Sequence, residues 1–75
     1  MSEKIPRITA EKAISVIEKI GFELVRQSGS HRIYRNKNGS RITIPVHSGK
    51  VLHPKIVKNI LRDADLSVEQ FRGLL

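Results

Sequence analysis

The fold is decided by the stretch Ser28-Gly29-Ser30-His31-Arg32-Ile33-Tyr34-Arg35, in which a short polar turn leads into a β-strand. Gly29 can adopt backbone angles that other residues avoid, and the serines on either side can hydrogen-bond to the nearby backbone. We therefore expect a tight turn that leaves His31 accessible at the start of the strand. An imidazole that titrates near neutral pH, followed by fixed positive charges, suits phosphate chemistry.

A helix and a strand are predicted before this turn. Thr9 is a suitable helix N-cap and Gly21 a natural helix stop. Between them, hydrophobic residues recur every three or four positions, which predicts a helix with one buried stripe, formed by Ala10, Ala13, Ile14, Ile17 and Ile20. The pattern then alternates, which predicts a strand with Phe22, Leu24 and Arg26 on one face and Glu23, Val25 and Gln27 on the other.

A third strand and two helices are predicted after His31–Arg35. Asn36-Lys37-Asn38-Gly39 is a strong turn signal and precedes a strand over Arg41–Val46, in which Pro45 marks an edge or an end. Pro54 is well placed to begin a second helix. Ser67-Val68-Glu69-Gln70 has the form of a capping box and begins a short last helix.

This order predicts an α+β fold: a helix, a three-stranded antiparallel sheet, a helix and a short C-terminal helix. We expect a two-layer sandwich that resembles the double-stranded-RNA-binding domain, with both main helices on one face of the sheet. The chain has 75 residues, which predicts a single domain over residues 1–75, loose only in residues 1–5.

The absence of certain residues and segments narrows the class of protein. The chain has no cysteine, which excludes disulfides and thiolate metal sites. It contains neither a run of 18 apolar residues nor a basic region followed by an apolar run at its start. We therefore expect a cytoplasmic protein with no membrane association.

Positive charge is concentrated in the middle of the chain. The formal net charge is +7, and no acidic residue lies between Leu24 and Arg62. That interval holds nine cations, namely Arg26, Arg32, Arg35, Lys37, Arg41, Lys50, Lys55, Lys58 and Arg62, together with all three histidines. Such a field attracts polyanions, most simply nucleic acid. Charge alone leaves open an acidic protein partner or an ordinary basic surface.

Alternation along the second strand bears on which side chains are accessible. If Ile33 is buried, Tyr34 lies on the open face together with Arg32, where it could stack on a base. Tyr34 could equally be an aromatic residue at the edge of the core. With Ile33 buried, His31 and Arg35 point toward the helices, so His31 must sit at the rim of the sheet to stay exposed.

Three segments resemble the HicA (YcfA-like) toxin family. They are Gly21 to Tyr34 with its Gly-Ser-His turn, Arg41 to His47 with its Pro-Val-His ending, and Ile60-Leu61 together with Leu66 through Phe71. The resemblance covers nearly the whole chain. It departs from the family at Lys55-Ile56, where many members have Gly-Thr.

The resemblance implies a toxin of a type II toxin–antitoxin pair, an endoribonuclease that cuts mRNA and is silenced by a HicB-type antitoxin. It implies that His31 is the catalytic residue. His47 matches a second histidine of the family, whose role stays open between catalysis, RNA binding and a hydrogen bond within its loop. The oligomeric state of the free protein is left open.

RNA carries its own nucleophile, so cleavage needs a base, an acid and stabilisation of the phosphorane, but no metal or other cofactor. We expect His31 to be the base and His47 to be the acid if it lies across the sheet edge. Three histidines without a regular ligand spacing argue against zinc, and His53 is expected at a helix start. The alternative is a noncatalytic RNA-binding module.

The residues expected around His31, as catalytic or RNA-binding groups, are Ser30, Arg32, Tyr34, Arg35, Arg41 and His47. Those expected to contact the RNA backbone, or else to form a solvated face, are Lys37, Lys50, Lys55 and Lys58.

Overall fold

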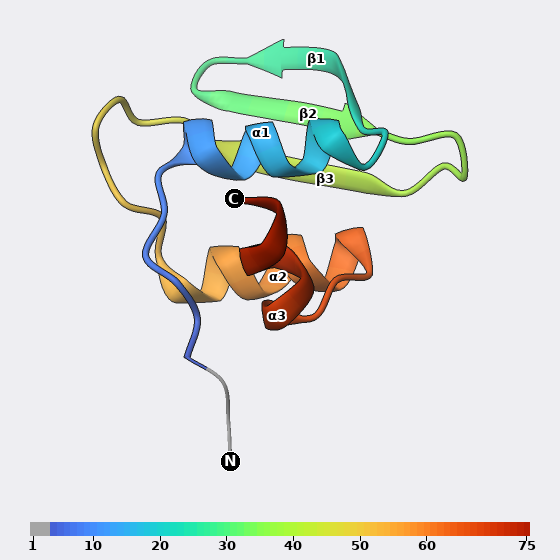
Figure 1. Cartoon of the computed structure of the whole chain (residues 1–75). Coiled ribbons are helices and arrows are strands. Elements are labelled where there is room, and N and C mark those ends of the chain that lie inside the picture. Colours follow the sequence, from blue (N-terminus) through green and yellow to red (C-terminus); the bar gives the residue numbers. More distant parts are fainter. Residues whose placement is uncertain (1–3) are drawn as a thin grey trace.

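The order of elements confirms the predicted layout. The computed structural model describes residues 4–75. The elements are α1 (Ala10–Lys19), β1 (Glu23–Ser28), β2 (His31–Arg35), β3 (Arg41–Pro45), α2 (Pro54–Ala64) and α3 (Val68–Leu74). Figure 1 shows the three strands side by side, with β1 at the top and all three helices below it. None of the described helices is long and apolar enough to cross a membrane.

Each helix begins at a residue that caps it. The Thr9 hydroxyl accepts a hydrogen bond from the Lys12 amide, and His53 Nδ1 accepts one from the Lys55 amide at 3.1 Å. Ser67 and Gln70 form the predicted capping box, with both reciprocal hydrogen bonds present. His53 is thus the predicted helix-start residue, and its ring nitrogen satisfies an amide that the helix itself leaves unpaired.

Gly21 ends α1 in a Schellman motif and turns the chain into the sheet. Its φ of 99° lies in the region that favours glycine. The Gly21 amide donates to the Glu18 carbonyl at 3.2 Å, and the Phe22 amide donates to the Ile17 carbonyl at 3.0 Å. Phe22 and Ile17 are both buried, which adds the hydrophobic contact typical of this motif.

The strands form an antiparallel sheet in the order β1-β2-β3. Tyr34 in β2 faces Leu24 in β1 and Ile42 in β3, while Arg32 faces Ile44. Residues paired in this way share a face of the sheet. Because Tyr34, Ile42 and Ile44 are at most 2% exposed, this face is the one covered by the helices.

The expectation that Ile33 is buried and Tyr34 lies on the open face is therefore wrong. Tyr34 is 2% exposed and belongs to the core, whereas Ile33 is only partly buried on the opposite face. Burying the larger ring removes more apolar surface from water, so this parity is favoured. It also turns His31 and Arg35 away from the helices.

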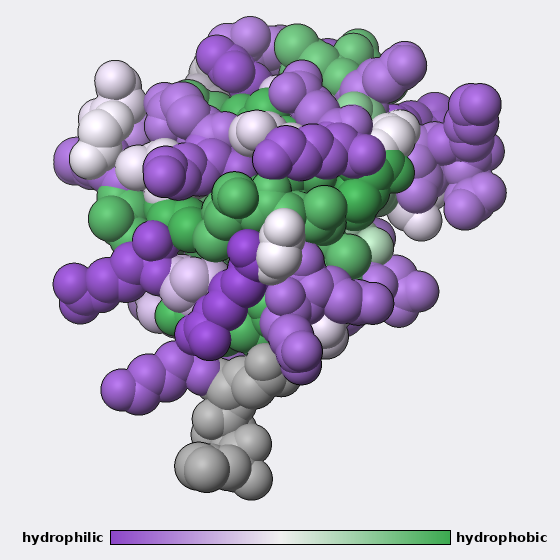
Figure 2. All heavy atoms as spheres, in the orientation of Figure 1, coloured by the Kyte–Doolittle hydropathy of each residue, from purple (hydrophilic) through white to green (hydrophobic). Residues whose placement is uncertain are grey.

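The helices cover the sheet unevenly. Both α1 and α2 contact β3, and α1 also contacts α3, whereas all six residues of β1 are exposed. Leu24 is 48% exposed although it faces Tyr34, and Val25 is 54% exposed. Figure 2 shows the resulting hydrophobic surface at the top of the molecule, over β1. The core therefore lies under β2 and β3.

The segment before α1 is bound to the rest of the protein. The Leu52 amide donates to the Ile8 carbonyl at 2.8 Å, and Thr9 forms an isolated bridge with Val51. Arg72 donates to the Lys4 carbonyl at 2.7 Å. Of the five residues expected to be loose, 1–3 lie outside the described part of the chain, and Ile5 packs against the core.

The burial of Tyr34 predicts a large effect on stability. Tyr34→Ala removes a buried ring and should lower the free energy of unfolding by about 3–5 kcal/mol. Tyr34→Phe keeps the ring and should cost less than about 1.5 kcal/mol. Urea denaturation followed by circular dichroism measures both. Wild-type stability in Tyr34→Ala would contradict the assignment of this ring to the core.

Candidate nucleic-acid interface

The side of the sheet that faces away from the helices carries the candidate site, and we call it the open face. Its members follow from the strand pairing, since each lies opposite or two positions away from another on the same side. They are Glu23, Arg26 and Ser28 of β1, His31, Ile33 and Arg35 of β2, and Arg41, Thr43 and Pro45 of β3.

His31 is presented at one end of the open face by a two-residue turn. Ser28 pairs with His31, so Gly29 and Ser30 form the turn between them. Gly29 has a φ of 58°, while Ser30 is outside the positive-φ region, the pattern of a type II′ hairpin turn. His31 is exposed at this end, as the sequence predicts. It lies at the end of the central strand, between Ser28 and Pro45, and points to the open face rather than toward the helices as the expected parity implied.

His47 lies at the same end of the sheet. Pro45, the last residue of β3, faces His31 in the ladder. The Val46 amide then donates to the Ser30 carbonyl at 2.7 Å, which ties the chain after β3 to the turn before β2. His47 is the next residue and is exposed. The structure therefore brings His31 and His47 to the same end of the sheet, where the Ser30 carbonyl links the chain before β2 to the chain after β3.

An irregularity in β1 puts Arg26 on the open face. Leu24 pairs with Tyr34, yet the residue that pairs with Ile33 is Arg26, so Val25 is an extra residue in a β-bulge. In a regular ladder, Arg26 would face Arg32 on the helix side. The expectation that Arg26 shares a face with Leu24 is therefore wrong.

Arg26 is thereby the arginine of the open face nearest to His31. It lies opposite Ile33, two positions along β2 from the histidine, a diagonal that spans about 7–8 Å between Cα atoms. That separation is within reach of a long side chain. Arg26 is not among the site residues that the sequence predicts. The bulge that turns it to this face is defined by the pairing of β1 with β2 and leaves no signal in the sequence alone.

Arg35 and Arg41 form a second positive centre at the other end of the open face. They face each other across β2 and β3, and both are exposed. Four residue steps separate Arg35 from His31, which is ~13 Å along a strand. These arginines, both predicted as site residues, can bind phosphates away from the imidazole.

Arg32 and Tyr34 do not belong to the open face. Arg32 lies on the helix side opposite Ile44, and its Nε is buried without a hydrogen-bond partner among the described residues. Tyr34 is in the core, where it is not available to stack on a base. The prediction that places these two with the accessible site residues is wrong, because the parity of β2 is opposite to the one assumed.

The predicted lysines are dispersed over the molecule. Lys37 is in the turn after β2, at the end of the sheet away from His31, and Lys50 is in the loop after β3. Lys55 and Lys58 are exposed on α2, in the helical layer. The ion pair found among residues 4–75 joins Arg62 and Asp63. On the open face, Glu23 lies opposite Arg35 in the ladder without forming an ion pair with it.

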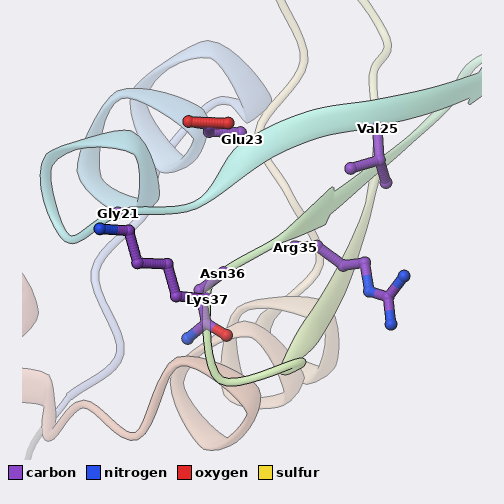
Figure 3. A pocket seen from close by; sticks show the side chains of 6 residues that line it. All are labelled: Gly21, Glu23, Val25, Arg35, Asn36 and Lys37. Carbon is purple, nitrogen blue, oxygen red and sulfur yellow. The ribbon is translucent and has the colours of Figure 1, made fainter.

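A shallow hollow of about 370 Å³ lies at the far end of the open face from His31. It is lined by Gly21, Glu23, Val25, Arg35, Asn36 and Lys37 (Figure 3). The described part of the chain has no cluster of three or more His, Asp or Glu side chains able to hold a metal ion. The functional groups on this face are therefore an imidazole and several guanidinium groups. The hollow adds hydrogen-bond donors and acceptors.

Comparison with known proteins identifies the family. A search of curated proteins found no match. The family model described as the HicA toxin of bacterial toxin–antitoxin systems matches residues 10–66, from the first residue of α1 to the end of the turn after α2. This family implies a HicB antitoxin as the partner. Because the match covers most of the 75 residues, this chain belongs to the HicA toxin family.

Proposed function

We propose that this HicA protein is a cytoplasmic endoribonuclease toxin that cuts mRNA with His31 as its general base. The observation that carries the proposal is the placement of an exposed imidazole on a cationic, acid-poor sheet face, one diagonal position from Arg26. Its family membership supports the same activity. A HicB-type antitoxin would silence it by covering this face.

The proposed reaction uses the ribose 2′-hydroxyl as the nucleophile. His31 takes the hydroxyl proton while the 2′-oxygen forms a bond to the adjacent phosphorus. The bond from phosphorus to the 5′-oxygen of the next nucleotide then breaks, and that oxygen receives a proton from His47. The products are a 2′,3′-cyclic phosphate and a 5′-hydroxyl, so the step is balanced without a metal or an added reactant.

Arg26 is proposed to stabilise the phosphorane, since Arg32 lies on the helix side of the sheet. The phosphorane carries more negative charge than the phosphodiester, and a guanidinium fixed beside it favours the transition state over the ground state. Arg35 in β2 and Arg41 in β3 lie at the other end of the open face, ~13 Å from His31 along the strands, and are proposed to bind neighbouring phosphates. Their contribution is then to affinity rather than to the chemical step.

His31→Ala should lower the single-turnover rate of RNA cleavage by about 10²- to 10⁴-fold. The side chain is exposed, so the variant should keep the wild-type circular dichroism spectrum. Cleavage is measured on single-stranded RNA in the presence of EDTA. Equal cleavage by both proteins would refute His31 as the base, and RNA binding without cleavage by either would favour a noncatalytic RNA-binding module.

Arg26→Ala should lower the cleavage rate at saturating RNA by about 10²-fold, the effect of losing one group that stabilises the transition state. Arg7→Ala removes the same charge from an exposed position before α1 and serves as the matched control. The two variants are compared by kcat on the same RNA. If Arg26→Ala raised KM alone, or resembled Arg7→Ala, Arg26 would not act on the phosphorane.

A further inference from the structure

The hollow at the far end of the open face has no part in the reaction proposed at His31. It lies where β1 begins and β2 ends, and its walls come from both strands and from the turns beside them. A second depression, lined by Ile20, Gly21, Asn36, Lys37 and Asn38, adjoins it and shares three of its residues. Together they continue the open face beyond Arg35, around Lys37.

The lining of the hollow offers hydrogen-bond donors from Asn36, Lys37 and Arg35. Asn36 Oδ1 accepts hydrogen bonds from the Asn38 amide at 3.1 Å and the Ser40 amide at 2.9 Å, which fixes the side chain. Its amide hydrogens remain available to a ligand. Lys37 and Arg35 make no side-chain hydrogen bond to the described residues, and Figure 3 shows Lys37 reaching toward Gly21 while Arg35 lies on the other side.

Glu23 and Val25 make the hollow suited to more than a phosphate. The Glu23 carboxylate can accept a hydrogen bond from a base N–H, which a phosphodiester does not offer. The exposed Val25 side chain gives an apolar surface for the face of a base. The β-bulge contributes here as well, because Val25 is the extra residue and lines the hollow together with Arg35.

We infer that the hollow is a second nucleotide subsite, which binds one base and its phosphate of the RNA that is cut at His31. The inference rests on the proposed nuclease function. Arg35 lies ~13 Å from His31 along β2. A stacked single strand advances by about 3.4 Å per nucleotide and an extended strand by more, so about four stacked nucleotides, or fewer extended ones, span the distance from His31 to Arg35 at the edge of the hollow.

The test is a truncation series on one RNA. The bond cut by the wild-type protein is mapped in a longer single strand, which is then shortened one nucleotide at a time from either end. Catalytic efficiency is measured at that same bond. We expect a drop of about tenfold at one truncation step on one side only, where the RNA ceases to reach the hollow.

Lys37→Ala tests whether that step belongs to the hollow. On the long RNA, Lys37→Ala should lower catalytic efficiency by up to about tenfold. Truncation past the step should then cause a smaller loss in the variant than in the wild type, because the removed nucleotide no longer had its contact with Lys37. Lys12→Ala, on the exposed side of α1, removes the same charge and should retain the full step.

The outcomes separate this inference from the proposed function. If truncation lowered the catalytic efficiency of Lys37→Ala by the same factor as that of the wild type, the two changes would act independently and the subsite would be refuted. A truncation series without a step would refute it as well. Either result would leave the proposed nuclease intact. A wild-type protein that cuts no RNA would refute the nuclease, and the subsite with it.

Discussion

The burial of Tyr34 is the constraint on which the functional surface depends. Successive side chains of a strand alternate between faces, so fixing one ring in the core fixes the direction of every other residue in β2. With Tyr34 against the helices, His31 and Arg35 must point away from them. The pairing with β3 extends the same constraint to Arg41. The stability of the core and the accessibility of the site thus have one cause.

The outer strand shows how an irregularity changes a surface without changing the core. A single extra residue at Val25 leaves Leu24 opposite Tyr34 and returns Arg26 to the side of His31. Because helix contacts are concentrated on β3, the bulge disturbs no buried packing. A bulge also interrupts the regular edge that β1 would otherwise present to another strand, which limits edge-to-edge association.

The order of the elements, their caps and the exposure of His31 could be predicted from the sequence. Thr9, Gly21, Pro54 and Ser67 act locally, and their effects can be inferred from neighbouring residues alone. The parity of β2 could not be obtained in this way, since Ile33 and Tyr34 are adjacent, both apolar and compatible with burial. The choice depends on how the helices fill the space under the sheet. Arg26 was missed for a related reason, since a bulge is defined by pairing between strands.

We propose that the His31 imidazole, turned outward by the burial of Tyr34, activates the 2′-hydroxyl of RNA beside the Arg26 guanidinium that the bulge positions. The most direct test is to identify the ends of the RNA fragments released by the wild-type protein, using mass spectrometry. We expect 2′,3′-cyclic phosphate and 5′-hydroxyl ends, which arise when the ribose itself is the nucleophile. Fragments with 5′-phosphate and 3′-hydroxyl ends would show attack by water and would contradict the proposal.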